Sequence, residues 1–179
     1  MIMIICAIVI FILFISIVSL SNKLNRAIIK IDEASSGIDV ALTKRYDVLT
    51  KMMEVVKKYT KHEKETLFEI VSLRKNMTID EKRIENEKMT QNFDKINVLT
   101  ESYPELKSSE NYKTLQKSIL EVEEHLQAAR RLYNSNVSLY NQMLVSFPSN
   151  IIASCKGMKR KEFFEIDSTK KEDIKIDLG

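Results

Sequence analysis

The sequence predicts an all-α protein: a single N-terminal transmembrane helix followed by an antiparallel up-and-down helical bundle. Three observations support this prediction. The first twenty residues carry no charged side chain. The residues that follow repeat their apolar side chains in steps of three and four, as one face of a helix does. Only 3 Gly and 2 Pro occur in 179 residues, which disfavours a many-stranded sheet because strands need turns between them.

Residues 1–21 are expected to be a transmembrane anchor. At about 1.5 Å per residue, the uncharged run Met1–Leu20 spans roughly 30 Å as a helix, which matches the hydrocarbon core of a bilayer. Lys23, Arg26 and Lys30 follow the run, so the positive-inside rule places the rest of the chain in the cytoplasm and the N-terminus outside. A cleaved signal peptide is the competing interpretation, although such peptides have a shorter apolar stretch preceded by positive charge.

A long helix is predicted directly after the anchor, because its apolar stripe has the spacing of coiled-coil or bundle packing. The stripe turns polar at Ser35 and Arg45. A break near 35–37 or near 61–62 would divide it into two helices. The stripe consists of Leu24, Ile28, Ile31, Ile38, Leu42, Leu49, Met52, Val56 and Tyr59, and a continuation is expected through Leu67, Ile70, Leu73 and Met77.

Two further helices are predicted from their capping signals. Thr78 and Glu81 have the spacing of a capping box, and Pro104 stops the helix they open near Tyr103. The apolar residues expected to face inward on this helix are Ile84, Met89, Phe93, Ile96 and Leu99. Ser108 or Ser109 is expected to cap the last helix, which ends at Phe147-Pro148. Its stripe is Tyr112, Leu115, Ile119, Val122, Leu126, Ala129, Tyr133, Asn136, Tyr140 and Met143.

Two Tyr-Asn pairs stand one heptad apart on this last helix. Tyr133-Asn134 and Tyr140-Asn141 therefore put both tyrosines on one face. The expected role is a core layer in which each ring is buried while its hydroxyl finds a partner; the alternative is a groove for a peptide or a lipid head group. Phe147 is expected to be buried in the terminating turn.

Charged residues at or beside the predicted apolar stripes indicate an ion pair between two helices. A buried charge is costly unless it is paired, so Asp47 or Glu54 is expected to meet Arg45, Arg130 or Arg131. The alternative is that these side chains contact a ligand or a partner.

The chain is divided by these signals into an anchor at 1–21, a helical bundle at 22–165 and a flexible charged tail at 166–179. Within the last part of the bundle, Phe163 and Phe164 are expected to dock on the helices. The tail lacks an apolar pattern and is expected to be solvated.

Composition and motifs argue against several functions. Charged residues make up 30% and are mixed in sign for a net charge of +3, which is not the pattern of a nucleic-acid binder. A di-iron bundle needs Glu-x-x-His motifs, whereas Tyr59 and Val122 precede the two histidines, His62 and His125. No Gly-rich phosphate loop or Gly-x-Ser-x-Gly turn occurs. We therefore expect no enzyme activity, no metal and no cofactor.

Several sequence blocks stand out along the chain: Lys44-Arg45-Tyr46-Asp47-Val48-Leu49, Glu101-Ser102-Tyr103-Pro104-Glu105-Leu106-Lys107, Ala129-Arg130-Arg131-Leu132-Tyr133-Asn134, Tyr140-Asn141 and Phe147-Pro148-Ser149-Asn150-Ile151-Ile152-Ala153. In this order the blocks resemble the LemA family, and the resemblance covers nearly the whole chain, from the anchor to about Glu165. Thr50-Lys51 stands where the family usually has Pro-Asn. The candidate structural or partner-contact residues within them are Arg45, Tyr46, Asp47, Tyr103, Pro104, Arg130, Arg131, Tyr133, Asn134, Tyr140, Asn141, Phe147 and Pro148.

The resemblance implies a bacterial membrane protein with a short external N-terminus and a cytoplasmic four-helix bundle. No activity, cofactor or substrate comes with it. We expect a membrane-tethered module that presents a surface to a membrane or cytoplasmic protein; the alternative is a self-assembling protein that organises membrane, and a magnetosome-associated relative fits this alternative by analogy.

Overall fold

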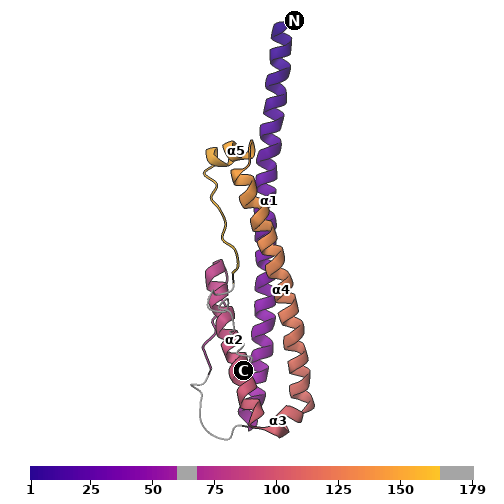
Figure 1. Cartoon of the computed structure of the whole chain (residues 1–179), viewed down its shortest axis with the longest axis vertical. Helices are drawn as coiled ribbons and strands as arrows, with labels where there is room; N and C mark the ends of the chain where they lie inside the picture. The colour runs from indigo at the N-terminus through magenta and orange to yellow at the C-terminus, as the bar shows by residue number, and fades with distance from the viewer. Residues whose placement is uncertain (60–67, 166–179) are drawn as a thin grey trace, which may run out of the picture. The chain divides into compact units, whose positions relative to one another are not determined.

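The computed structural model describes residues 1–59 and 68–165, and over those ranges it contains helices and no strand. Figure 1 shows the helices along the chain. They are α1 (Ile2–Tyr59), α2 (Ile79–Glu101), α3 (Pro104–Ser108), α4 (Glu110–Val145) and α5 (Ser149–Cys155). The all-α prediction is confirmed. The predicted tail at 166–179 and the stripe residue Leu67 lie outside the described residues.

The chain divides into two compact units. The first unit consists of Met1–Lys44 and Leu120–Phe163, and the second of Arg45–Ile119 and Phe164–Gly179. α1 and α4 each contribute a different stretch to each unit. The units are described one at a time below.

α1 begins in the uncharged run and continues as helix to Tyr59, through Ser35–Gly37 and through Thr50-Lys51. Its N-terminal part is long and apolar enough to cross a membrane, and within the chain none of that part is buried. The charged and amphipathic part follows in the same helix. Leu24, the first residue of the predicted stripe after the anchor, is fully buried. Within about one turn, α1 therefore changes from a helix that is apolar on every face to one that buries a single apolar face.

In the first unit, α1 and α4 pack antiparallel, as Figure 1 shows. The Asn136 side chain donates to the carbonyl oxygen of Lys30 at 3.0 Å, and a Cβ at Gly37 would lie 4.0 Å from the Cβ of Ala129. Residue numbers thus fall along α4 as they rise along α1. Most of the buried side chains between them come from the predicted stripes, namely Leu24, Ile31, Ile38, Leu42, Val122, Leu126, Tyr133 and Tyr140. Ala34, Ala41 and Val137 are also buried, although the predicted stripes did not include them.

In the second unit, the predicted inward face of α2 is only partly correct. Met89 and Ile96 are fully buried, but Ile84 is 44% exposed, and the buried stripe also contains Lys82, Glu85, Asn92 and Thr100. The physical reason is the segment that precedes α2, because residues 69–74 are not helical and need polar partners for their backbone groups.

The predicted continuation of the first helix through Ile70, Leu73 and Met77 is therefore wrong. Ile70 is 84% exposed, and the chain turns at Asn76, whose φ of 60° is a left-handed conformation that Asn tolerates. Tyr59, the last predicted stripe residue before that point, is 37% exposed.

Helix ends in the second unit follow the predicted capping signals. The Thr78 hydroxyl accepts from the Glu81 N–H at 3.2 Å, and the Glu81 carboxylate accepts from the Thr78 N–H at 2.7 Å. Ser109 caps α4 by accepting from the Tyr112 N–H at 3.4 Å. Pro104 ends α2 but also opens α3, a short helix that the sequence did not predict.

The end of α4 differs from the prediction in one respect. Phe147 is 80% exposed, not buried, because Ser149 takes the inward position in the turn. The Ser149 hydroxyl lies 2.6 Å from the Met143 carbonyl oxygen and 2.9 Å from that of Ser146, so it satisfies carbonyls at the end of the helix. Further along, Phe164 is 2% exposed and docks as predicted, whereas Phe163 is 42% exposed.

Candidate functional site

The two tyrosines of α4 in the first unit hold a returning segment of the same chain. The Tyr133 hydroxyl donates to the Glu162 carbonyl oxygen and the Tyr140 hydroxyl to that of Lys159, both at 3.1 Å. Asn141 adds a pair of bonds with Lys161: its Nδ2 donates to the carbonyl at 2.9 Å and its Oδ1 accepts from the N–H at 3.0 Å. Asn134 lies half-buried beside Tyr133. This row binds an extended peptide through its backbone, and that peptide is residues 159–162.

Burial raises the pKa of both tyrosine hydroxyls above the ordinary value. For Tyr133 the carboxylates of Glu162 and Asp32 raise the pKa further. Both side chains are therefore uncharged hydrogen-bond donors at neutral pH.

In the second unit, Arg45 links α1 to α2. Its side chain is 3% exposed, and its guanidinium donates to the carbonyl oxygen of Asn86 at 2.8 Å, to the side-chain oxygen of Asn86 at 2.7 Å and to the Thr90 hydroxyl at 3.1 Å. These acceptors are an amide and a hydroxyl, whereas the sequence suggested a carboxylate. Asp47 and Glu54 are exposed. The pairing of either carboxylate with an arginine of another helix stays a prediction.

The arginines of α4 differ in exposure. Arg130 is 9% exposed and belongs to the buried face, whereas its neighbour Arg131 is exposed. In the second unit, Tyr103 is half-buried at the start of α3, and Pro104 is the first residue of that helix.

Polar residues of α2 bind the segment before it, and sequence reasoning missed them. Asn92 accepts from the Glu69 N–H at 2.7 Å and donates to the Glu69 carbonyl oxygen at 3.0 Å. Glu85 accepts from the Ser72 N–H at 2.7 Å and from the Lys88 ammonium at 2.8 Å. Burial raises the pKa of Glu85, but these two hydrogen bonds, together with the positive charges of Lys88 and Arg74, outweigh it and leave the pKa below its usual value. The signal was present in the sequence, because 82, 85, 89, 92, 96 and 100 follow helical spacing.

A cleft of about 330 Å³ lies beside this segment in the second unit. Tyr46, one of the predicted contact residues, forms part of its wall and is 37% exposed. The other lining residues are Leu49, Thr50, Met53, Glu54, Lys57, Phe68, Glu69, Ile70, Val71, Met89 and Asn92. The lining thus combines apolar side chains with the charged residues Glu54, Lys57 and Glu69.

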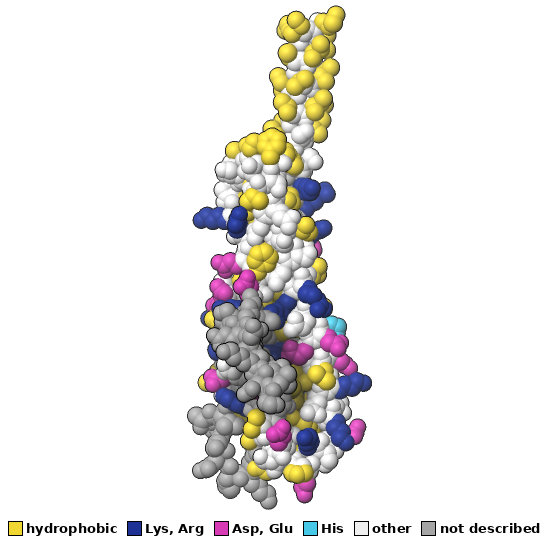
Figure 2. Space-filling model, in the orientation of Figure 1, with side chains coloured by type: hydrophobic (Ala, Val, Ile, Leu, Met, Phe, Trp, Pro, Cys, Tyr) yellow, Lys and Arg dark blue, Asp and Glu magenta, His cyan; other side chains and the backbone are white. Residues whose placement is uncertain are grey.

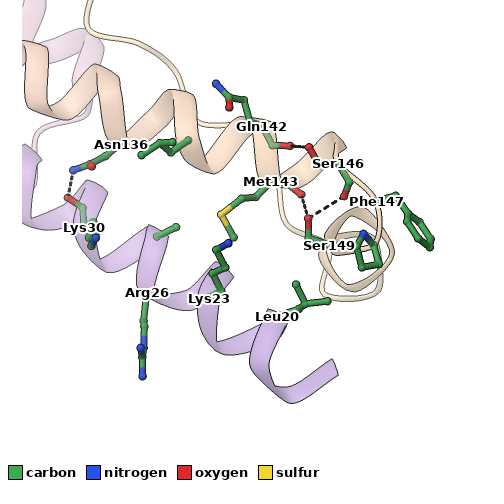
Figure 3. Close-up of a pocket in the computed structure, with 13 residues that line it drawn as sticks. Leu20, Lys23, Arg26, Lys30, Asn136, Gln142, Met143, Ser146, Phe147 and Ser149 are labelled. Atoms are coloured by element: carbon green, nitrogen blue, oxygen red, sulfur yellow. Dashed lines mark hydrogen bonds between the residues drawn. The ribbon is translucent and has the colours of Figure 1, made fainter. Parts of the chain in front are cut away.

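A larger cavity of about 700 Å³ lies in the first unit, between α1 and the end of α4. In Figure 3, Lys23 reaches from α1 toward Met143 on α4, whereas Arg26 points away from α4. The lining residues are Leu20, Lys23, Arg26, Ala27, Lys30, Asn136, Leu139, Gln142, Met143, Ser146, Phe147, Pro148 and Ser149. None of these thirteen residues is acidic and three are basic, so the lining of the cavity combines positive charge with apolar surface.

Metal ligands are not grouped in the part of the chain that the structure describes. Over 1–59 and 68–165, no three His, Cys, Asp or Glu side chains are placed to share a metal ion.

Fold and sites together define an all-helical protein with an N-terminal helix able to cross a membrane. The model of the LemA family matches residues 34–178, and the chain belongs to the LemA family. Protein LemA of Metamycoplasma hominis is 30% identical over 158 residues, which cover 86% of this chain and 72% of that protein.

Two magnetosome proteins match a shorter region. Magnetosome protein MamQ 2 of Paramagnetospirillum magneticum is 34% identical over 67 residues, which are 37% of this chain and 25% of that protein. Magnetosome protein MamQ of Magnetospirillum gryphiswaldense is 29% identical over 66 residues, 37% of this chain and 24% of that protein. The chain therefore spans about a quarter of each of these magnetosome proteins.

Proposed function

We propose that this LemA-family chain is a non-enzymatic membrane protein whose anchor is residues 1–21 and whose helical bundle presents a protein-binding surface in the bacterial cytoplasm. The uncharged run continues into the amphipathic part of α1 without a break, which supports an anchor joined rigidly to the domain. The proposed architecture of that domain is an antiparallel bundle of four helices.

The proposed orientation rests on charge. Lys23, Arg26 and Lys30 follow the apolar run, and positive residues beside a span favour the cytoplasmic side. Fusing alkaline phosphatase or a fluorescent protein to the C-terminus tests this. Fluorescence without phosphatase activity is expected, and strong phosphatase activity would reverse the orientation.

The cleft beside Tyr46 is the observation that favours a protein partner. Ile70 is 84% exposed there, next to the apolar side chains of Met53 and Phe68. Covering apolar surface stabilises a complex by about 25 cal/mol per Å². A rim that includes Glu54 and Lys57 supplies polar contacts around such a centre, which is the usual composition of a protein interface.

Photocrosslinking in intact cells tests the cleft. Benzoylphenylalanine replaces Ile70 in one variant and Val98 in the control, because Val98 is also a strongly exposed aliphatic residue of the second unit, at 69%. A crosslink to a second protein is expected from position 70 and not from position 98. The substitution Tyr46→Asp should reduce that crosslink, because it puts a charge into the cleft.

The other outcomes separate the alternatives. Crosslinks only between copies of this chain would favour the alternative, a self-assembling, membrane-organising protein. Equal crosslinking at positions 70 and 98, or none at 70, would contradict a binding role for the cleft.

A further inference from the structure

The turn between α4 and α5 lies beside the point where α1 leaves its uncharged run. The Lys156 ammonium donates a hydrogen bond to the Ser21 hydroxyl. Leu20 lines the same cavity as Phe147 and Ser149, and Figure 3 shows Leu20 facing the turn that carries them. All of these residues belong to the first unit.

This turn exposes large apolar side chains. Phe147 is 80% exposed and Ile151 is 55% exposed, whereas the inward positions are taken by the small residues Ser149 and Ala153, which are 6% and 2% exposed. Figure 2 shows hydrophobic side chains gathered at the end of the unit from which the bare apolar helix emerges. Exposed apolar side chains gathered at one place mark a surface that contacts a partner or a membrane.

The same end of the unit is strongly basic. Residues 20–30 and 140–161 contain no Asp or Glu, although the whole chain is nearly balanced, with 28 basic and 25 acidic residues. In Figure 2, Lys and Arg side chains lie next to the hydrophobic end, on the side away from the bare apolar helix. The basic residues in these two stretches are Lys23, Arg26, Lys30, Lys156, Lys159, Arg160 and Lys161, and all of them are exposed.

The cavity of about 700 Å³ joins the two features. Lys23 provides a cation within it, and Ala27, Leu139 and Met143 provide apolar wall. A phosphate next to hydrocarbon matches this combination, and an anionic phospholipid presents both in one molecule.

We propose that this end of the first unit is a second membrane contact, selective for anionic phospholipids. Phe147 and Ile151 enter the boundary between head groups and acyl chains, as amphipathic interfacial elements do, and Lys23 binds a lipid phosphate. The remaining basic side chains attract the anionic leaflet. The proposal rests on the proposed anchor at residues 1–21, because that anchor brings the turn to the membrane surface.

A single tryptophan can report on this contact, because the chain contains no Trp. The full-length chain carrying Phe147→Trp is reconstituted into vesicles of phosphatidylcholine, with or without phosphatidylglycerol. The matched control is Leu132→Trp, a residue of α4 in the same unit that is 57% exposed. Circular dichroism verifies that both variants keep the helix content of the parent.

Tryptophan at 147 is expected to emit at shorter wavelength than tryptophan at 132 and to be quenched at least about twofold more strongly by bromine-labelled lipid. Phosphatidylglycerol should strengthen that quenching, and high salt should weaken it by screening. Replacing Lys159, Arg160 and Lys161 together with Gln should reduce the dependence on phosphatidylglycerol, because three of the seven basic side chains are then neutral.

Three results would overturn the proposal. The first is equal lipid quenching at 147 and 132 while the chain resists carbonate extraction, which would leave the anchor intact and refute the contact alone. The second is loss of the phosphatidylglycerol effect on adding inorganic phosphate but not on adding sodium chloride to the same ionic strength, which would assign the cavity to a soluble phosphate. The third is release of the folded chain by carbonate, which would refute the anchor and the contact with it.

Discussion

The Tyr140 hydroxyl donates a hydrogen bond to the carbonyl oxygen of Lys159 at 3.1 Å, and the ring that carries it is 1% exposed. The acceptor is a main-chain group, so the contact fixes the position of the segment and leaves its side chains outside. Lys159, Arg160 and Lys161 are exposed for this reason. The tyrosine row of α4 thus displays the basic residues that the proposed membrane contact requires.

Removing the Tyr140 hydroxyl should loosen the segment it holds. The substitution Tyr140→Phe keeps the buried ring and deletes one hydrogen bond, which stabilises by about 1 kcal/mol. Opening of residues 159–162 should then become roughly fivefold more frequent. Limited trypsin digestion after Lys159, Arg160 or Lys161, followed by mass spectrometry, measures this. Tyr103→Phe, in the second unit, serves as the control, and equal cleavage rates in the two variants would contradict the prediction.

Arg45 should contribute strongly to stability. The substitution Arg45→Ala removes three hydrogen bonds from a buried guanidinium and leaves the Asn86 acceptors without it, so a loss of about 2–4 kcal/mol in the free energy of unfolding is expected. Urea unfolding of the detergent-solubilised chain measures it. Arg131→Ala changes an exposed side chain and should alter the free energy of unfolding by less than about 0.5 kcal/mol.

A double-mutant cycle tests whether Arg45 acts through Asn86. The free-energy changes of Arg45→Ala and Asn86→Ala should fall short of additivity by about 1 kcal/mol, because each substitution alone removes the bond between the guanidinium and the Asn86 side-chain oxygen. Additive changes would show that this bond contributes nothing to the effect of Arg45.

The capping box should make the start of α2 sensitive to one hydroxyl. The substitution Thr78→Ala removes the acceptor for the Glu81 N–H and should cost about 1 kcal/mol in the free energy of unfolding. Thr78→Ser restores the acceptor and should recover most of that loss. A Ser variant as unstable as the Ala variant would show that the methyl group of Thr78 matters and the cap does not.

The free energy of unfolding should fall as the pH rises above 10.0, the ordinary pKa of tyrosine. Burial raises the pKa of Tyr133 and Tyr140 in the folded chain, so the unfolded chain loses these protons first and the difference favours unfolding until the folded tyrosines ionise as well. The stabilisation is complete below pH 10.0 and is lost above it.

Comparison with a double variant isolates the two tyrosines from the lysines that titrate in the same range. Tyr133→Phe with Tyr140→Phe should show a shallower decline in unfolding free energy above pH 10.0 than the parent chain. Parallel declines in urea titrations at several alkaline pH values would refute the assignment.

Structural features that depend on only a few neighbouring residues were predictable from the sequence. The Thr78 cap, the end of α2 before Pro104 and the cap at Ser109 depend on local hydrogen bonds and fixed dihedral angles. The buried faces of α1 and α4 were also predictable, because each repeats apolar residues at helical spacing over many turns.

Features that depend on distant partners were not predictable. Ile84 faces outward because Glu85 and Asn92 face the segment at 69–72, whose lack of helix could not be read from its apolar spacing. Phe147 was expected to be buried on hydrophobicity alone, yet the hydroxyl of Ser149 occupies the inward site.

The amino-acid sequence by itself determined the helical class, the apolar helix at the start and the family of this protein, since periodicity, hydropathy and ordered motifs are properties of the chain read in one dimension. Only the tertiary structure decided that the tyrosines of α4 bind residues 159–162 and that a basic, apolar end lies beside Ser21. The first arrangement depends on backbone carbonyls of residues 159–162 that find partners only after the chain has returned along α4. The second includes a side-chain hydrogen bond between Lys156 and Ser21, which are 135 positions apart in the sequence.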